Sequence, residues 1–69
     1  MATNRKIYNS NNAHISVELM LNADGVGGIL AIAVEDDEYW FTIGWYQTEK
    51  NALRAAGRRL ADHGYTLNI

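Results

Sequence analysis

Three segments of the chain have patterns of apolar and polar residues that predict β-strands: residues 14–21, 29–34 and 39–46. The first alternates strictly, with apolar residues at its odd-numbered positions, which is typical of a strand with one buried face. The second is apolar on both sides and is therefore predicted to be central. The third carries a Trp on each side, Trp40 and Trp45, so that each face of the sheet is expected to receive one.

The segments between these strands contain turn-forming residues. The stretch "NADGVGG", residues 22–28, has an Asp-Gly pair and two more glycines, which allow the positive φ angles of a tight hairpin. The acidic run Glu35–Glu38 separates the second strand from the third, and Asp36 and Asp37 are the predicted turn residues. Two successive hairpins make the three strands antiparallel.

A helix is predicted over residues 49–63. Thr48 is its expected N-cap, because the hydroxyl can accept a backbone amide of the first turn, and Glu49 lies where the helix dipole favours an acid. Small and apolar residues fall on one arc of this helix: Ala52, Leu53, Ala56, Gly57 and Leu60. That arc is suited to close packing on a sheet.

These elements predict an α+β fold with the order β-β-β-α-β, in which one helix packs on one face of an antiparallel three- to four-stranded sheet. His63 and Gly64 are expected to end the helix with a left-handed cap, before a short final strand over residues 65–69. Residues 1–12 are polar and are predicted to form a flexible N-terminal arm, and residues 13–69 a single domain.

A single helix covers only one face of such a sheet. The helix is predicted to cover the apolar residues of the first strand and one side of the third strand. That side consists of Tyr39, Phe41, Ile43 and Trp45. The uncovered face would then be an apolar patch made of Met20, Ile29, Ala31, Ala33, Trp40 and Tyr46. Such patches mark interfaces. Two alternatives stay open: the two faces are reversed, or the N-terminal arm covers the patch.

Charged residues are segregated along the chain, although the formal net charge is only −2. Four of the six basic residues lie in the predicted helix: Lys50, Arg54, Arg58 and Arg59. Half of the eight acids form the turn: Glu35, Asp36, Asp37 and Glu38. The net charge gives no general attraction to nucleic acid or membrane, so charged recognition would have to use one of these poles. The start "MATNRKIYNS" has no apolar run, and a cytoplasmic location without membrane contact is expected.

No cluster of residues predicts catalysis, a cofactor or a metal site. His14 and Glu18 share a strand face but are separated by roughly 13 Å, too far to ligate one ion. The stretch "NADG" lacks the spaced oxygen ligands of a calcium loop, and "GVGG" lacks the Lys and Ser/Thr of a phosphate loop. His63 is expected to cap the helix. We therefore expect a chain that is not an enzyme and that binds no cofactor.

The basic residues Lys50, Arg54 and Arg58 form a stripe with a spacing of four residues along the predicted helix. Such a stripe can follow a phosphate backbone, contact an acidic protein surface, or be a solvated helix face. Asp62 is placed to pair with Arg58, which favours the solvated face. The sequence leaves these three interpretations open.

The overall plan is a very small acidic α+β chain with no motif, no Cys and an uncovered aromatic face. This plan resembles that of small phage or mobile-element proteins, including anti-CRISPR inhibitors. The resemblance covers size and layout over the chain and assigns no stretch such as "WFTIGWYQTEKNALRAAGRRL" to a family. It implies a function in which the chain blocks a host defence complex by stoichiometric binding.

We interpret the sequence as a non-enzymatic protein-binding module whose partner is a host complex or a second copy of the chain. The predicted partner-binding residues are Met20, Glu35, Asp36, Asp37, Glu38, Trp40 and Tyr46. The alternative is a small nucleic-acid-binding protein or regulator that uses Lys50, Arg54 and Arg58, which are also the candidates for contact with an acidic partner. A third interpretation is a homodimer in which two sheet faces bury each other.

Overall fold

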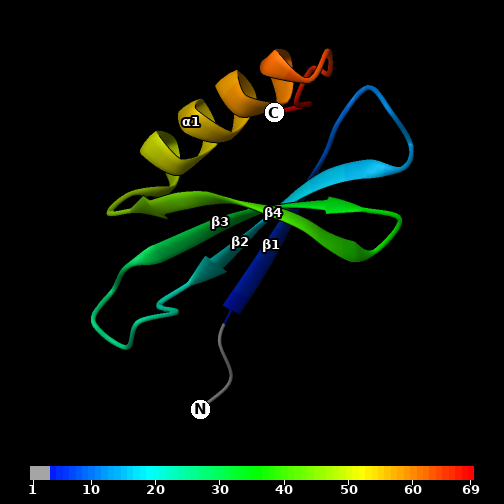
Figure 1. Cartoon of the computed structure of the whole chain (residues 1–69). Helices are drawn as coiled ribbons and strands as arrows, with labels where there is room; N and C mark the ends of the chain where they lie inside the picture. The colour runs from blue at the N-terminus through cyan, green and yellow to red at the C-terminus, as the bar shows by residue number, and fades with distance from the viewer. Residues whose placement is uncertain (1–3) are drawn as a thin grey trace.

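The computed structural model describes residues 4–69, which form an antiparallel four-stranded sheet with one helix packed on it. The elements are β1 (Asn4–Asn9), β2 (Ile15–Leu21), β3 (Ile29–Glu35), β4 (Glu38–Tyr46) and α1 (Glu49–Asp62). The strand order is β1-β2-β3-β4, so that each strand pairs with its neighbours in sequence. In Figure 1 the helix lies along one side of the twisted sheet. The predicted α+β class with one helix on one sheet face is confirmed.

The N-terminal segment differs from the prediction. Residues 1–12 were expected to form a flexible arm, but Asn4–Asn9 pair along their whole length with β2 and form an edge strand. Lys6 and Tyr8 lie on the helix side of this strand, opposite Leu19 and Val17. Residues 1–3 of the predicted arm lie outside the described residues. The domain of the described chain therefore begins at the first strand, not at residue 13.

The C-terminal segment is shorter in regular structure than predicted. Instead of a strand over residues 65–69, it makes one isolated bridge between Ser10 and Leu67. Leu67 is buried in the core, and the backbone amide of Asn68 donates to the carbonyl of Asn9. The chain end thus holds the end of β1 through a few hydrogen bonds, and the element order is β-β-β-β-α rather than β-β-β-α-β.

The helix begins and ends as its sequence predicts. The Thr48 hydroxyl accepts the backbone amide of Asn51, and Gly64 follows the C-cap His63 with a φ of 86°. The carboxylate of Glu49 accepts hydrogen bonds from Lys6 at 3.0 and 3.1 Å, and these raise the pKa of the Lys6 amine above its usual value. The first turn of α1 is therefore also tied to β1.

The core lies between α1 and one face of the sheet. Its fully buried members include Leu19 on β2 and Leu60 on α1. Ala31 and Ala33 of β3 belong to the same cluster as Ala52 and Ala56 of α1. Because these side chains are small on both elements, the helix can approach the sheet closely. We call this side of the sheet the covered face.

Candidate partner-binding surfaces

Two bulges in β4 decide which of its side chains lie beneath the helix. This strand has nine residues opposite the seven of β3, and the register shifts twice. Phe41 pairs with Ala33, but Tyr39 pairs with Val34, so Trp40 is an extra residue. A second shift makes Ile43 extra. Each bulge moves the residues beyond it by one position, and the simple alternation along β4 no longer assigns its faces.

Trp40 lies on the covered face, and its predicted place on the open patch is wrong. Its ring lies 4.9 Å from the ring of Phe41 and 4.9 Å from that of His63, the C-cap of α1. A third neighbour is Tyr65, at 6.3 Å. Because Trp40 is an extra residue, it and its neighbour Phe41 both pack toward the helix end.

Tyr46 also lies on the covered face, again against the prediction. It pairs with Ile29, which is buried, and its ring folds back over Gly44. A side chain at Gly44 would place a Cβ 2.8 Å from the Tyr46 hydroxyl, so only glycine leaves room for this ring. The other predicted members of the patch, Ile29, Ala31 and Ala33, are core residues. Of the predicted apolar patch, only Met20 lies on the uncovered side.

The uncovered side of the sheet, which we call the open face, consists of three cross-strand rows that follow from the strand register. The first row is Arg5, Met20, Leu30 and Trp45. The second is Ile7, Glu18, Ile32 and Thr42. The third is Asn9, Ser16, Val34 and Tyr39. No other helix or strand of residues 4–69 lies over these rows.

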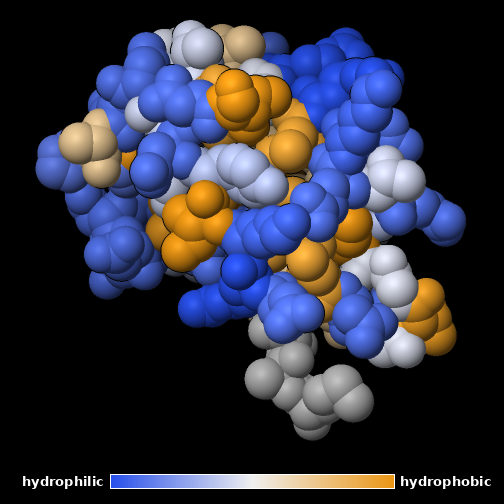
Figure 2. Space-filling model, turned by 180° about the vertical axis from the view of Figure 1, so that it is seen from behind, coloured by the Kyte–Doolittle hydropathy of each residue, from blue (hydrophilic) through white to orange (hydrophobic). Residues whose placement is uncertain are grey.

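The open face exposes large apolar side chains. Ile7, Tyr39 and Trp45 are 61%, 64% and 54% exposed, and each lies in a different row. Val34 is only 4% exposed although it lies outside the core cluster, so its neighbours on this face shield it. Figure 2 shows that apolar side chains reach the surface in several patches between polar ones. The prediction of an uncovered apolar face holds, with largely different residues.

A carboxylate lies near the centre of the open face. Glu18 is in the middle row, and its side chain is 15% exposed. Its Oε1 atom is buried and accepts no hydrogen bond from the described residues. The Arg5 Nε lies 3.4 Å away, close enough for an ion pair. This ion pair compensates part of the cost of burying the carboxylate.

The acidic turn, Glu35–Glu38, joins β3 and β4 at one end of the sheet. Asp36 and Asp37 have φ angles of 53° and 65°, and positive φ at both central positions is the mark of a two-residue type I′ hairpin. The predicted turn residues are therefore confirmed. Asp36 contacts the ring of His14 across the sheet end, and all four acids are exposed. The turn directly precedes Tyr39 of the open face.

Four basic side chains lie exposed on α1, and we call them the basic helix residues: Lys50, Arg54, Arg58 and Arg59. Within residues 4–69, none of them has a carboxylate oxygen within 4.0 Å. The predicted pair between Asp62 and Arg58 is therefore not formed. Arg59 instead lies over the ring of Phe41, at 4.9 Å from its centroid. In contrast, Arg5 and Lys6 of β1 are both paired with acids.

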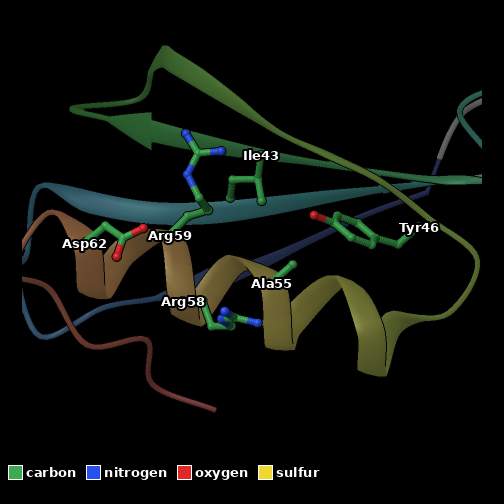
Figure 3. Close-up of a pocket in the computed structure, with 6 residues that line it drawn as sticks. All are labelled: Ile43, Tyr46, Ala55, Arg58, Arg59 and Asp62. Atoms are coloured by element: carbon green, nitrogen blue, oxygen red, sulfur yellow. The ribbon is translucent and has the colours of Figure 1, made fainter.

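A groove runs between β4 and α1. It has a volume of about 240 Å³ and is lined by Ile43, Tyr46, Ala55, Arg58, Arg59 and Asp62. Figure 3 shows Ile43 and Tyr46 entering it from the strand, while the arginines come from the helix. Sequence reasoning placed Ile43 beneath the helix but Tyr46 on the uncovered face, and it missed this groove because the bulge at Ile43 brings both side chains to the helix side.

The part of the chain that the structure describes contains neither a metal-binding cluster nor a membrane-spanning helix. Across residues 4–69, no group of three His, Cys, Asp or Glu side chains could hold an ion. His63 packs on Trp40 and Phe41 at the helix end. The only described helix, α1, is too short and too polar to span a membrane.

A comparison with protein-family models finds no match to this chain, and a comparison with the solved structures finds none either.

Proposed function

We propose that this chain is a non-enzymatic protein-binding module that docks a partner protein on its open face. The observation that carries the proposal is the exposure of Ile7, Tyr39 and Trp45 by more than half on one sheet face. Aromatic and aliphatic residues that gather on one face are typical of the centre of a protein interface. Their exposure is unfavourable for the isolated chain, and docking would remove it from water.

The surroundings of the open face indicate the chemistry of the partner. The acidic turn precedes Tyr39 at one end of this face, and its four acids are exposed. A partner with an apolar centre and basic residues beside it would complement both the apolar side chains and the turn. The charged turn would mainly accelerate association, and the aromatic residues would slow dissociation.

The test compares three exposed apolar residues. Trp45→Ser and Tyr39→Ser remove side chains from the open face, whereas Val26→Ser changes a residue that is 87% exposed in the β2–β3 loop. We expect partners captured by the wild type to be retained by Val26→Ser. Removal of a central Trp should weaken binding by about 2 kcal/mol, roughly 30-fold. Equal capture by all three variants, with unchanged circular dichroism, would contradict the proposal.

We extend the proposal to stoichiometric inhibition of a host defence complex. Its support is the likeness in size and layout to small phage inhibitors, together with the open face. Titration of the purified chain into such a complex should reduce activity to an end point at a fixed molar ratio. A loss of activity that depends on time and not on stoichiometry would argue for catalysis instead.

A second candidate, nucleic-acid binding by α1, is favoured by the four basic helix residues that have no acidic partner within residues 4–69. If they contact phosphates, affinity should fall with salt at a log-log slope of roughly −0.9 per duplex phosphate contacted. Absence of binding to DNA and RNA at low salt would remove this candidate.

A homodimer through the open faces is checked by sedimentation, where Trp45→Ser should shift dimer to monomer.

A further inference from the structure

The outer edge of β4 is unpaired along the strand. β4 pairs only with β3, and within residues 4–69 no turn or loop forms a backbone hydrogen bond to its other side. The opposite edge strand, β1, is partly engaged, because the C-terminal segment bridges to Ser10 at its end. An unpaired strand edge offers backbone donors and acceptors to an added strand.

The bulges limit where a strand can be added. They are centred on Trp40 and Ile43, and a bulged edge is a poor template for pairing. After Ile43 the register with β3 is regular as far as Tyr46. A short extended segment can therefore pair next to residues 44–46, which is also where the groove between β4 and α1 opens.

The groove is built to receive side chains from such a segment. Its aliphatic wall is Ile43 on β4 and Ala55 on α1, and the small alanine gives it depth. The hydroxyl of Tyr46 points into it and forms no hydrogen bond with any residue of the range 4–69 (Figure 3). In an extended segment, alternate side chains point to the same side, so every second residue would enter the groove.

The charges of the groove define its occupant. Arg58 and Arg59 line it without an acidic partner within 4.0 Å in the described chain, and Asp62 is its only acid. The stacking of Arg59 on Phe41 holds that guanidinium in place. A guanidinium binds a carboxylate in a bidentate manner. The groove therefore complements a segment that carries acids, and the aliphatic wall complements apolar residues between them.

We propose that the edge of β4 and its groove bind an extended acidic segment of a partner protein by strand addition. A peptide fits better than a nucleic acid, because the site combines an unpaired strand edge with an aliphatic wall. A second copy of the chain fits poorly along this edge, since two such edges would bring their arginines together. The groove of this site lies on the covered side of the sheet, and the proposal does not depend on the function proposed above.

The experiment uses a labelled synthetic peptide with the repeat Glu-Ser-Val-Ser, in which the side chains on one side of the extended strand alternate between Glu and Val. Fluorescence anisotropy measures its affinity for the wild type and for two double variants. Arg58→Gln with Arg59→Gln changes the groove, and Lys50→Gln with Arg54→Gln removes the same charge from the same helix outside it. We expect a roughly tenfold loss for the groove variant and a change of less than about twofold for the control. Amide shifts in NMR spectra should be confined to β4 and α1.

Three further measurements can overturn the proposal. Two versions of the peptide carry N-methyl groups at the odd or at the even positions, so that one of them lacks the backbone donors that face β4. Equal binding of both versions and of the parent peptide would exclude strand addition. Equal losses in the two double variants, or no binding at about 1 mM peptide, would exclude the groove as the site. Stronger displacement of the peptide by single-stranded DNA than by unlabelled peptide would assign the arginines to nucleic acid. Ile7→Ser, on the open face but in the edge strand at the opposite side of the sheet, should leave peptide binding unchanged, which separates this proposal from the open face.

Discussion

The two faces of the same sheet differ in what covers them. On the covered face, Val17, Leu19, Ala31 and Ala33 are completely buried beneath α1. On the open face, Met20, Leu30 and Ile32 are half-buried and the larger apolar residues are exposed. The chain thus carries apolar side chains on both faces but has only one helix with which to exclude water. The covered face accounts for the fold, and the open face leaves large apolar side chains exposed.

The two tryptophans show how this difference arises in a single strand. Trp40 and Trp45 are both in β4, and a strict alternation places them on opposite faces, as the sequence predicts. They do lie on opposite faces, but each on the face opposite to the predicted one. The helix end shields Trp40 through His63 and Tyr65, whereas Trp45 is 54% exposed. Bulges therefore decide which aromatic residue stabilises the fold.

The largest expected effect is the difference in the free energy of unfolding between a variant of the covered face and a variant of the open face. Leu60→Ala removes a completely buried side chain between helix and sheet and should lower the free energy of unfolding by about 2–5 kcal/mol. Trp45→Ser on the open face should change it by only about 0.5 kcal/mol. Urea unfolding followed by far-UV circular dichroism measures both. Comparable losses for the two variants would mean that the open face is part of the core.

Fluorescence can locate the two tryptophans directly. In Trp40→Phe the remaining Trp45 should emit at long wavelength and be quenched efficiently by iodide or acrylamide, because more than half of it is exposed. In Trp45→Phe the remaining Trp40 should be blue-shifted and protected by its ring contacts. If the wild-type partner binds the open face, it should protect Trp45 and leave the emission of Trp40 unchanged. Protection of Trp40 alone would reverse the assignment of the faces.

A smaller effect concerns the acidic turn that sets the register between β3 and β4. Asp36→Asn with Asp37→Gly supplies the residue pair that a type I′ turn prefers. It should raise the free energy of unfolding by about 0.5–1 kcal/mol, because relief of the left-handed backbone at position 37 exceeds the entropy cost of Gly. If the turn also attracts a basic partner, the same variant should associate more slowly at low salt. Glu35 and Glu38 are kept to preserve solubility. An unchanged association rate would restrict recognition to the apolar residues.

The sequence predicts most elements of this fold but not the faces of β4. The helix, its caps and the two hairpins follow from local residues such as Thr48, Gly64 and the Asp36–Asp37 pair, which act through their own backbone. β1 was missed because it has few apolar residues and pairs through its backbone with β2. The bulges depend on how nine residues fit against seven, and alternation along one strand carries no information about its partner.

Because alternation along one strand carries no information about its partner, the sequence predicted that an uncovered apolar face exists but not most of the residues on it. An uncovered apolar face follows from one helix and one sheet, and Met20 was placed on it correctly. Ala31 and Ala33 were assigned to the wrong face, although small residues are the ones that a close helix requires. The register between β2 and β3 decides which side of β3 faces the helix, and the seven-residue loop between the two strands sets it. Several hydrogen bonds together hold the conformation of this loop.

The smallest predicted effect is the pH dependence of that loop. The Asp24 carboxylate accepts the backbone amides of Val26 and Gly28 at 2.9 and 2.8 Å, and these bonds lower its pKa below the usual value. Because the folded pKa is lower than the unfolded pKa of about 3.9, the contribution to stability is complete above the unfolded value. It is lost as the pH falls through the folded pKa.

This contribution is measured against Asp24→Asn, which keeps an acceptor oxygen but cannot ionise. The wild type should be slightly more stable than the variant at neutral pH, and the difference should vanish as the pH falls through the folded pKa. The amide shifts of Val26 and Gly28 should titrate in the wild type at a pH lower than about 3.9 and stay constant in the variant.

Since a one-residue slip between β2 and β3 would exchange their two faces, quenching of Trp45 and Trp40 is recorded in parallel. If Asp24 titrates without any change in Trp quenching, the strand register survives protonation of this carboxylate. The difference between the two faces is then fixed by burial beneath α1 and not by the charge on Asp24.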